Sequence, residues 1–316
     1  MTNESTTSTP LHPPIGTFQE VDGRRLHLHR QGSGGPAVVL LPGASAIGLD
    51  YFGVQQGVAQ FTTAVVYDRA GTGFSDDAPL PRTAAEVATE LHELLHAQAV
   101  PGPYVLVAHS LGGAYAHRFA QLYPQDVAGL VWLDAFHRDW DAYMPPEASL
   151  AATQRLSPTE EQLRQSLPGI RRMCEELLTD FPADLRDALV EYHVSERWIH
   201  AGMAERASMP DLAVELRAGA DLPDVPLIAV TPLGVDPGQL EVMGAELLQA
   251  MHDGKTRLYA DMVDRVSDGE QRILSDTGHS QVVFERVDAV VQAIRNVVED
   301  AVEKAGCDGA GQEDPA

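Results

Sequence analysis

The sequence has few cysteines, few lysines and no long apolar runs. Cys174 and Cys307 are its two cysteines and lie far apart, so the composition predicts neither a disulfide framework nor a cysteine metal cluster. No run of about 18 apolar residues is present, as a membrane-spanning helix would need. The N-terminal MTNESTTSTP lacks the basic and apolar parts of a signal peptide. We therefore expect a soluble, cytoplasmic protein.

Basic residues are outnumbered by acidic ones, and the net charge is −24. This charge repels nucleic acids and anionic lipid surfaces and disfavours a polyanionic substrate. We expect a small neutral or weakly polar substrate, with neither nucleic acid nor membrane as a partner. The 316 residues, 44% of them hydrophobic, suffice for one large domain with an insertion. Composition leaves the oligomeric state open.

One stretch, YVLVAHSLGGAY from Tyr104 to Tyr115, joins an uncharged apolar run to a segment with helical periodicity. Such a run is typical of a parallel strand buried on both faces. The chain must reverse around Ser110 within a few residues, which requires small neighbours, and A-H-S-L-G supplies them except that Ala108 replaces the usual first glycine. A serine at this place can also simply cap a helix. The strand before it and the helix after it favour a nucleophile.

This stretch resembles the nucleophile elbow of the α/β-hydrolase superfamily, in the esterase-like form with HSLGG. The resemblance implies an α/β fold with a mostly parallel twisted sheet, flanked by helices and carrying an inserted helical cap. It covers roughly residues 20–300. We expect a disordered lead-in at 1–16, a hydrolase core at 17–136 and 223–304, a cap at 137–222 and a polar tail at 305–316.

Two aspartates compete for the acid of a Ser-His-Asp triad. Asp134 ends the apolar stretch VAGLVWLDA, 24 residues after Ser110, which places it at the tip of the neighbouring strand. Some lactone hydrolases and the haloalkane dehalogenases of the superfamily place their acid there, whereas many members place it one strand later, where this chain has Asp236. Asp236 lies between Pro232 and Pro237, as an ordinary turn residue also would. We favour Asp134.

The resemblance also implies a base and an oxyanion hole. His279 follows the last expected strand through a glycine and precedes a final amphipathic helix, as the superfamily's catalytic histidine does. The oxyanion donors would be the backbone N–H groups of Ala44, in the loop after PAVVLLPG, and of Leu111. Pro42 stands where the superfamily usually has histidine, but the donor belongs to Ala44 and is unaffected.

Residues 137–222 break the alternation of strands and helices, and we interpret them as a cap that roofs the site and shapes its pocket. Seven bulky residues in this region are candidates for lining the pocket or for plain packing, and His137 is another candidate. They are Trp140, Tyr143, Met144, Met173, Tyr192, Trp198 and Met203.

These features predict a serine hydrolase that cleaves a carboxylic ester or lactone through an acyl-enzyme formed on Ser110. No metal and no organic cofactor is expected. Hydrolysis of a thioester or of a C–C bond is the alternative within enzymes. Some proteins of this fold instead bind a small ligand as receptors with little turnover, so that class stays open.

Overall fold

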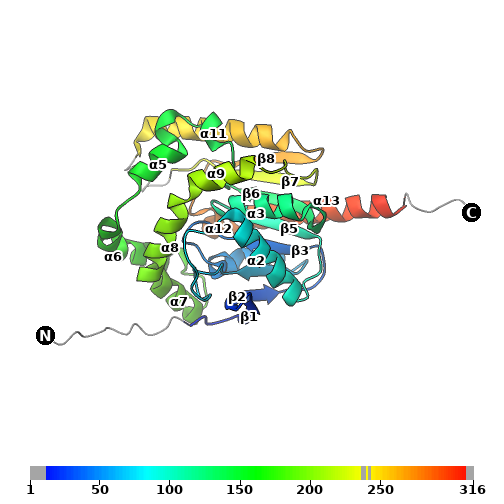
Figure 1. Cartoon of the computed structure of the whole chain (residues 1–316), viewed down its shortest axis with the longest axis horizontal. Helices are drawn as coiled ribbons and strands as arrows, with labels where there is room; N and C mark the ends of the chain where they lie inside the picture. The colour runs from blue at the N-terminus through cyan, green and yellow to red at the C-terminus, as the bar shows by residue number, and fades with distance from the viewer. Residues whose placement is uncertain (1–11, 236–239, 241–242, 311–316) are drawn as a thin grey trace, which may run out of the picture.

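A computed structural model describes residues 12–235, 240 and 243–310 of the chain, and its centre is one eight-stranded sheet (Figure 1). The strand order is β1-β2-β4-β3-β5-β6-β7-β8. Pairs β1–β2 and β2–β4 are antiparallel and the others are parallel. The strands are Thr17–Val21 (β1), Arg24–Gln31 (β2), Ala37–Leu41 (β3), Ala64–Tyr67 (β4), Tyr104–His109 (β5), Val127–Leu133 (β6), Leu227–Pro232 (β7) and Gly269–Leu274 (β8). The predicted mostly parallel α/β sheet is thereby confirmed.

Helices cover both faces of this sheet. On one face lie Ala84–Ala97 (α2), Gly112–Leu122 (α3), Met209–Arg217 (α9) and Ala245–Val263 (α11); on the other lie Phe52–Val58 (α1), Val282–Glu285 (α12) and Val287–Ala310 (α13). Short 3-10 turns occupy Gly48–Tyr51 and Pro124–Asp126. Alternate residues of each central strand point to opposite faces, so Val105 and Val107 pack under α13 while Leu106 and Ala108 pack under α3. The central strands β3 to β7 are buried on both faces, which explains why their sequences carry no charge.

The segment between β6 and β7 is helical and lies over one end of the sheet (Figure 1). It contains Trp140–Tyr143 (α4), a 3-10 turn at Pro146–Ala148, Leu150–Leu156 (α5), Glu160–Leu177 (α6), Ala183–His193 (α7), Glu196–Ala207 (α8) and then α9. Side chains begin several of these helices, since Thr159 accepts the Gln162 N–H and Ser195 accepts the Trp198 N–H. Because this end carries the carboxyl ends of the parallel strands, the insertion covers the usual location of a ligand site.

A buried ion pair joins this insertion to the sheet. Arg69, just after β4, places Nη2 2.7 Å from Oε1 of Glu205 on α8, and the two side chains are only 2% and 3% exposed. Burial opposes the charge on Arg69, but the Glu205 carboxylate outweighs burial and raises the pKa of Arg69 above its usual value. Removing one partner of such a pair typically costs 3 to about 5 kcal/mol, because a buried charge is left alone. Helix α8 is therefore held firmly to the core.

The last helix extends beyond the expected end of the core. Residues 305–316 were predicted to be a polar tail, and the first part of this stretch belongs to α13, which runs from Val287 to Ala310. Lys304 donates to the Asp224 backbone carbonyl at 2.8 Å, which ties this end of the helix down. Residues 305–310 contain no proline, so the helical ladder continues through Gly306 and Gly309 at a cost of about 1 kcal/mol each. None of the helices in the described ranges is long and apolar enough to cross a membrane.

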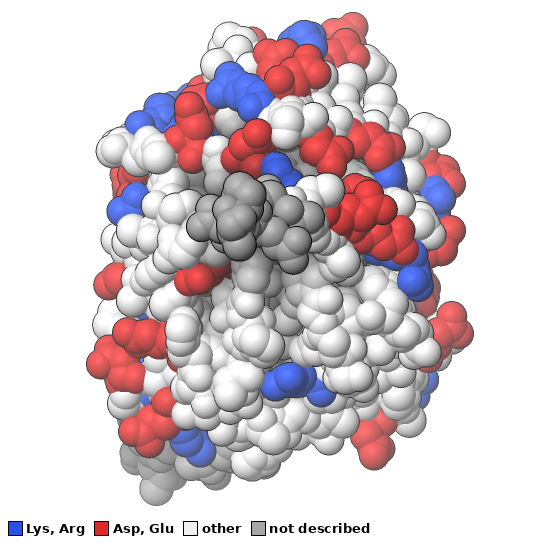
Figure 2. All heavy atoms as spheres, turned by 90° about the vertical axis from the view of Figure 1, so that its right-hand side faces the viewer, with Lys and Arg blue, Asp and Glu red and all other residues white. Residues whose placement is uncertain are grey.

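Acidic side chains gather on the face from which α13 projects, away from the cap (Figure 2). Asp300 on α13 has a raised pKa, first because of burial and then because of the nearby carboxylates of Asp268 and Glu303. Part of the acidic excess of the chain therefore lies on this face. Exposed charges farther apart than about 8 Å are largely screened at physiological salt, so the overall charge does not fix the potential under the cap.

Two histidines are buried next to each other between α3 and the chain that leaves β6. His117 is 1% exposed and His137 is 5% exposed, with their ring centroids 6.2 Å apart. Burial lowers the pKa of His117 to about 3 and that of His137 to about 4, because an imidazolium would lose its hydration there. Both rings are therefore neutral near pH 7.

These histidines predict an acid-sensitive fold. Since the ordinary histidine pKa of 6.5 exceeds both folded-state values, the unfolded chain binds more protons than the folded chain between about pH 4 and pH 6.5. The free energy of unfolding should then rise with pH across this window by up to about 1.4 kcal/mol per pH unit for each histidine. Urea unfolding at pH 7.5 and pH 5.5 measures it. In His117→Gln the free energy of unfolding should rise less steeply with pH, by the equivalent of about one proton. His200→Gln, at an exposed position of α8, should keep the wild-type rise. An equal rise in both variants would contradict the assignment to His117.

Candidate active site

Ser110 sits at the tip of β5 in a backbone conformation that few residues other than glycine adopt. Its φ is 50°, and α3 begins two residues later at Gly112. A Cβ on Gly112 would lie 2.1 Å from the Leu41 carbonyl oxygen, and one on Gly113 would lie 2.5 Å from the Phe136 carbonyl oxygen. Both positions therefore need glycine, whereas Ala108 is accommodated with no exposure. The strained turn aims the serine side chain away from the sheet, toward the cap.

The structure brings Ser110, His279 and Asp134 together in a line of hydrogen bonds. His279 Nε2 lies 3.0 Å from Ser110 Oγ, and His279 Nδ1 lies 2.8 Å from Asp134 Oδ2. Asp134 also has a positive φ, 43°, at the end of β6, the strand beside β5. The favoured acid is thus the one in contact with the histidine. Asp236 lies outside the described residues.

The Asp134 carboxylate has two further partners, both on α11, that the sequence did not reveal. Lys255 Nζ donates to Asp134 Oδ2 at 2.8 Å, and the Tyr259 hydroxyl donates to Oδ1 at 3.1 Å. Burial opposes ionisation of Asp134, but Lys255 and His279 outweigh it and hold the pKa of this carboxyl well below its usual range. Burial and the adjacent carboxylate also raise the pKa of Tyr259, which keeps its proton for donation. Asp134 is therefore a fixed anion.

The loop after β3 passes directly against the serine. A Cβ on Gly43 would lie 2.9 Å from Ser110 Cβ, so this close approach also requires glycine. Arg69 donates to the Pro42 carbonyl at 2.8 Å and to the Gly43 carbonyl at 3.0 Å. Since the C=O and N–H of a trans peptide point in opposite directions, the Gly43 contact turns the Ala44 N–H away from Arg69. Among the described residues, the Ala44 and Leu111 amides donate to no protein group.

His109, between Ala108 and the serine, connects this loop to the histidine loop. Its Nε2 lies 3.0 Å from the His279 carbonyl oxygen, so Nε2 carries the proton, and Nδ1 accepts from the Tyr51 hydroxyl at 2.7 Å. Tyr51 in turn accepts the Gly43 N–H at 3.2 Å. Burial first, and then the His279 charge, lowers the pKa of His109 to about 3, so it stays neutral. His109 thus links the loop after β3 to the loop that carries His279.

Two cavities meet at Ser110 and His279, and both are bordered by the helical segment between β6 and β7. The smaller, of about 210 Å³, is bordered by Trp140, and the larger, of about 510 Å³, is bordered by Met173 and Trp198. Arg206 of α8 and Met243 border both. Of the other candidates from the cap, Tyr143, Met144, Tyr192, Met203 and His137 line neither of these cavities in the described structure. Three of the seven bulky candidates therefore face the cavities.

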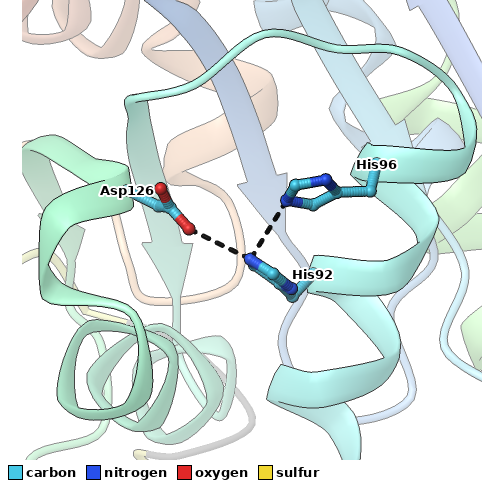
Figure 3. Close-up of side chains that lie close together, drawn as sticks. All are labelled: His92, His96 and Asp126. Atoms are coloured by element: carbon cyan, nitrogen blue, oxygen red, sulfur yellow. Dashed lines mark hydrogen bonds and ion pairs between the residues drawn. The ribbon is translucent and has the colours of Figure 1, made fainter.

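Two groups among the described residues place three possible metal ligands within 4.8 Å of one another. In the first, His92 and His96 of α2 meet Asp126 before β6 (Figure 3), with 3.0 Å from His92 Nε2 to Asp126 Oδ2. It lies at the amino ends of β5 and β6, the opposite edge of the sheet from Ser110. The second group, Glu160, Glu196 and His200, surrounds the Arg164 guanidinium, which pairs with both carboxylates. Neither group touches the serine site.

The hydrogen bond from His279 to Asp134 gives a direct mutational test. Asp134→Asn should lower kcat for a 4-nitrophenyl ester by about 10⁴-fold, because an amide favours the wrong tautomer of His279. Asp236→Asn is the matched control and should keep most of the activity. Steady-state kinetics with both purified variants measures the difference, and a large loss in the Asp236 variant alone would show that the other aspartate is the acid.

Comparison with known proteins places this site in a family. A model of the Alpha/beta hydrolase family matches residues 38–293. The uncharacterized protein YqjL of Bacillus subtilis is 29% identical over 157 residues, which are 48% of this chain and 62% of YqjL. The uncharacterized protein Rv2715 of Mycobacterium tuberculosis is 33% identical over 123 residues, which are 39% of this chain and 36% of Rv2715. This chain thus spans less than two thirds of the length of these curated relatives.

Solved structures show the same architecture. Cfl2 from Burkholderia cenocepacia superposes with a TM-score of 0.66 at 23% identity, covering 90% of this chain and 95% of Cfl2. A thermophilic esterase from Thermogutta terrifontis gives a TM-score of 0.57 at 19% identity, covering 90% of this chain and 97% of the esterase. At such identities the likeness establishes the fold alone. Because the family model covers most of the sequence, the chain belongs to the Alpha/beta hydrolase family.

Proposed function

We propose that the protein is a serine hydrolase that cleaves a small carboxylic ester or lactone through an acyl-enzyme. The observation that carries the proposal is the pair of contacts at His279, 3.0 Å to Ser110 Oγ and 2.8 Å to Asp134 Oδ2. A serine hydroxyl is a weak nucleophile unless a base removes its proton, and a base needs an acid to fix its orientation. Both conditions are met at hydrogen-bonding distance.

In the acylation step, Ser110 Oγ attacks the substrate carbonyl carbon as its proton moves to His279 Nε2. The carbonyl oxygen becomes an oxyanion, and the Ala44 and Leu111 N–H groups would donate to it. Loss of one such donor typically raises the barrier by about 3 kcal/mol. His279 then returns the proton to the leaving alkoxide as the C–O bond breaks. Asp134 stabilises the imidazolium that exists between these two transfers.

Deacylation repeats these steps with water. His279 removes a proton from a water molecule, the hydroxide attacks the acyl carbon, and Ser110 leaves with the proton returned by His279. In a lactone the leaving alkoxide stays attached to the acyl group, so one hydroxy acid is released. Two cavities meet at Ser110, so the acyl part and the alcohol part of an ester could each bind in its own cavity.

The same machinery would act on a thioester or on a C–C bond next to a carbonyl, and these remain the alternatives within enzymes. A receptor of this fold would differ in lacking an effective nucleophile. The ester or lactone is preferred because the oxyanion donors and one histidine base suffice for it.

A fluorophosphonate probe and a serine substitution test the proposal together. The probe should label the wild-type protein at Ser110, and Ser110→Ala should lose both labelling and hydrolysis of 4-nitrophenyl butyrate, by about 10⁴-fold or more in kcat. Ser280→Ala is the matched control, since Ser280 is an exposed serine that borders the larger cavity next to His279. Turnover at the wild-type rate in Ser110→Ala would exclude Ser110 as the nucleophile. A wild-type protein that shows neither labelling nor turnover would favour a receptor.

A further inference from the structure

Arg206 is a cation that borders both cavities. Its side chain comes from α8, beside Ser110 and His279, and among the described residues no carboxylate lies within ion-pair distance of it. Burial, only partly offset by Glu205, lowers the pKa of Arg206. Arginine nevertheless stays protonated in proteins, so a positive charge remains in this partly dry place. Although the chain has 46 acidic residues, none of the described ones pairs with Arg206, so this guanidinium is available to bind an anionic group of a ligand.

The neighbouring acid cannot neutralise it. Both oxygens of Glu205 are taken, Oε1 by Arg69 at 2.7 Å and Oε2 by the Ser45 N–H at 2.8 Å. Asp50, which borders the larger cavity, accepts the Ile47 N–H at 2.9 Å and faces His193 Nε2 at 2.8 Å. These carboxylates serve the protein's own donors.

A second unused donor lies next to Arg206. Ser45 is 2% exposed, yet its hydroxyl has no hydrogen-bond partner in the described structure. A Cβ on Gly202 would lie 2.0 Å from Ser45 Oγ and 2.7 Å from Arg206 Nη1. The two donors therefore lie close together, next to the backbone of Gly202. Ser45 also holds a φ of 64°, a strained conformation that is retained mainly at functional sites. A buried hydroxyl without a partner is costly, which indicates that a ligand supplies one.

We propose that Ser45 and Arg206 form a carboxylate-binding subsite beside Ser110, so that the preferred substrate is an ester or lactone that also carries a free carboxylate group. A guanidinium and a hydroxyl together match the oxygens of one carboxylate, and the planar guanidinium fork suits two of them. This inference rests on the proposed hydrolase function for its substrate, but the subsite itself exists without turnover. It replaces the neutral substrate expected from net charge, because the local charge under the cap is positive at Arg206.

A matched pair of substrates tests the subsite. The 4-nitrophenyl monoester of adipic acid and its counterpart with a terminal primary amide differ in charge and hardly in shape. Wild-type kcat/KM should favour the acid by about ten- to hundredfold, the size expected for a hydrogen bond to a charged group. Arg206→Met should bring the ratio near one, and Arg206→Lys, which keeps the charge without the fork, should keep part of it. Arg155→Met, at an exposed position of α5, is the control and should keep the wild-type ratio.

Binding of adipate, measured by titration calorimetry, separates the subsite from catalysis. Adipate should bind the wild-type protein and bind at least tenfold more weakly to Arg206→Met, with a smaller loss in Ser45→Ala. A wild-type protein with no preference for the acid ester and no adipate binding would overturn the subsite, even if neutral esters are hydrolysed. Adipate binding that depends on Arg206, in a protein that hydrolyses neither ester and resists the fluorophosphonate probe, would support the subsite and reject the proposed hydrolase.

Discussion

The buried ion pair between Arg69 and Glu205 is the interaction on which the geometry around the serine depends. Each side chain satisfies the other's charge and then uses its remaining atoms on the same loop: Arg69 binds the Pro42 and Gly43 carbonyls, and Glu205 binds the Ser45 N–H. The loop that carries the Ala44 amide is therefore fixed by a residue of the cap. The same helix, α8, places Arg206 at the cavities. The helical segment between β6 and β7 and the sheet are thus joined at the serine, and a change in α8 would reach Ser110 through this ion pair.

The turn around Ser110 was predictable because local sequence dictates it. A buried strand, a serine between small residues and a helix leave one geometry for Ser110, and the spacing to Asp134 follows from one helix plus one strand. The choice between Asp134 and Asp236 depended on strand order, and the structure brings Asp134 to His279. The polar composition of residues 305–310 did not indicate their conformation, and the structure continues α13 to Ala310.

Contacts between segments far apart in the chain could not be predicted from the sequence. Lys255 and Tyr259 lie four residues apart and so share one face of α11, but only the packing of α11 beside β7 brings that face to Asp134. Lys255 is one of just two lysines, which was the available signal. Net charge is likewise an average over the whole chain, and it does not reveal that Arg206 borders both cavities.

A rapid-quench experiment tests most directly whether catalysis passes through an ester of Ser110. The protein is mixed with excess 4-nitrophenyl butyrate, nitrophenol release is followed on the millisecond scale, and the quenched protein is mapped by peptide mass spectrometry. We expect an initial burst approaching one nitrophenol per protein chain and a butyryl group on the peptide that contains Ser110. Steady hydrolysis with no burst and no acyl adduct under these conditions, or an adduct on another residue, would contradict it.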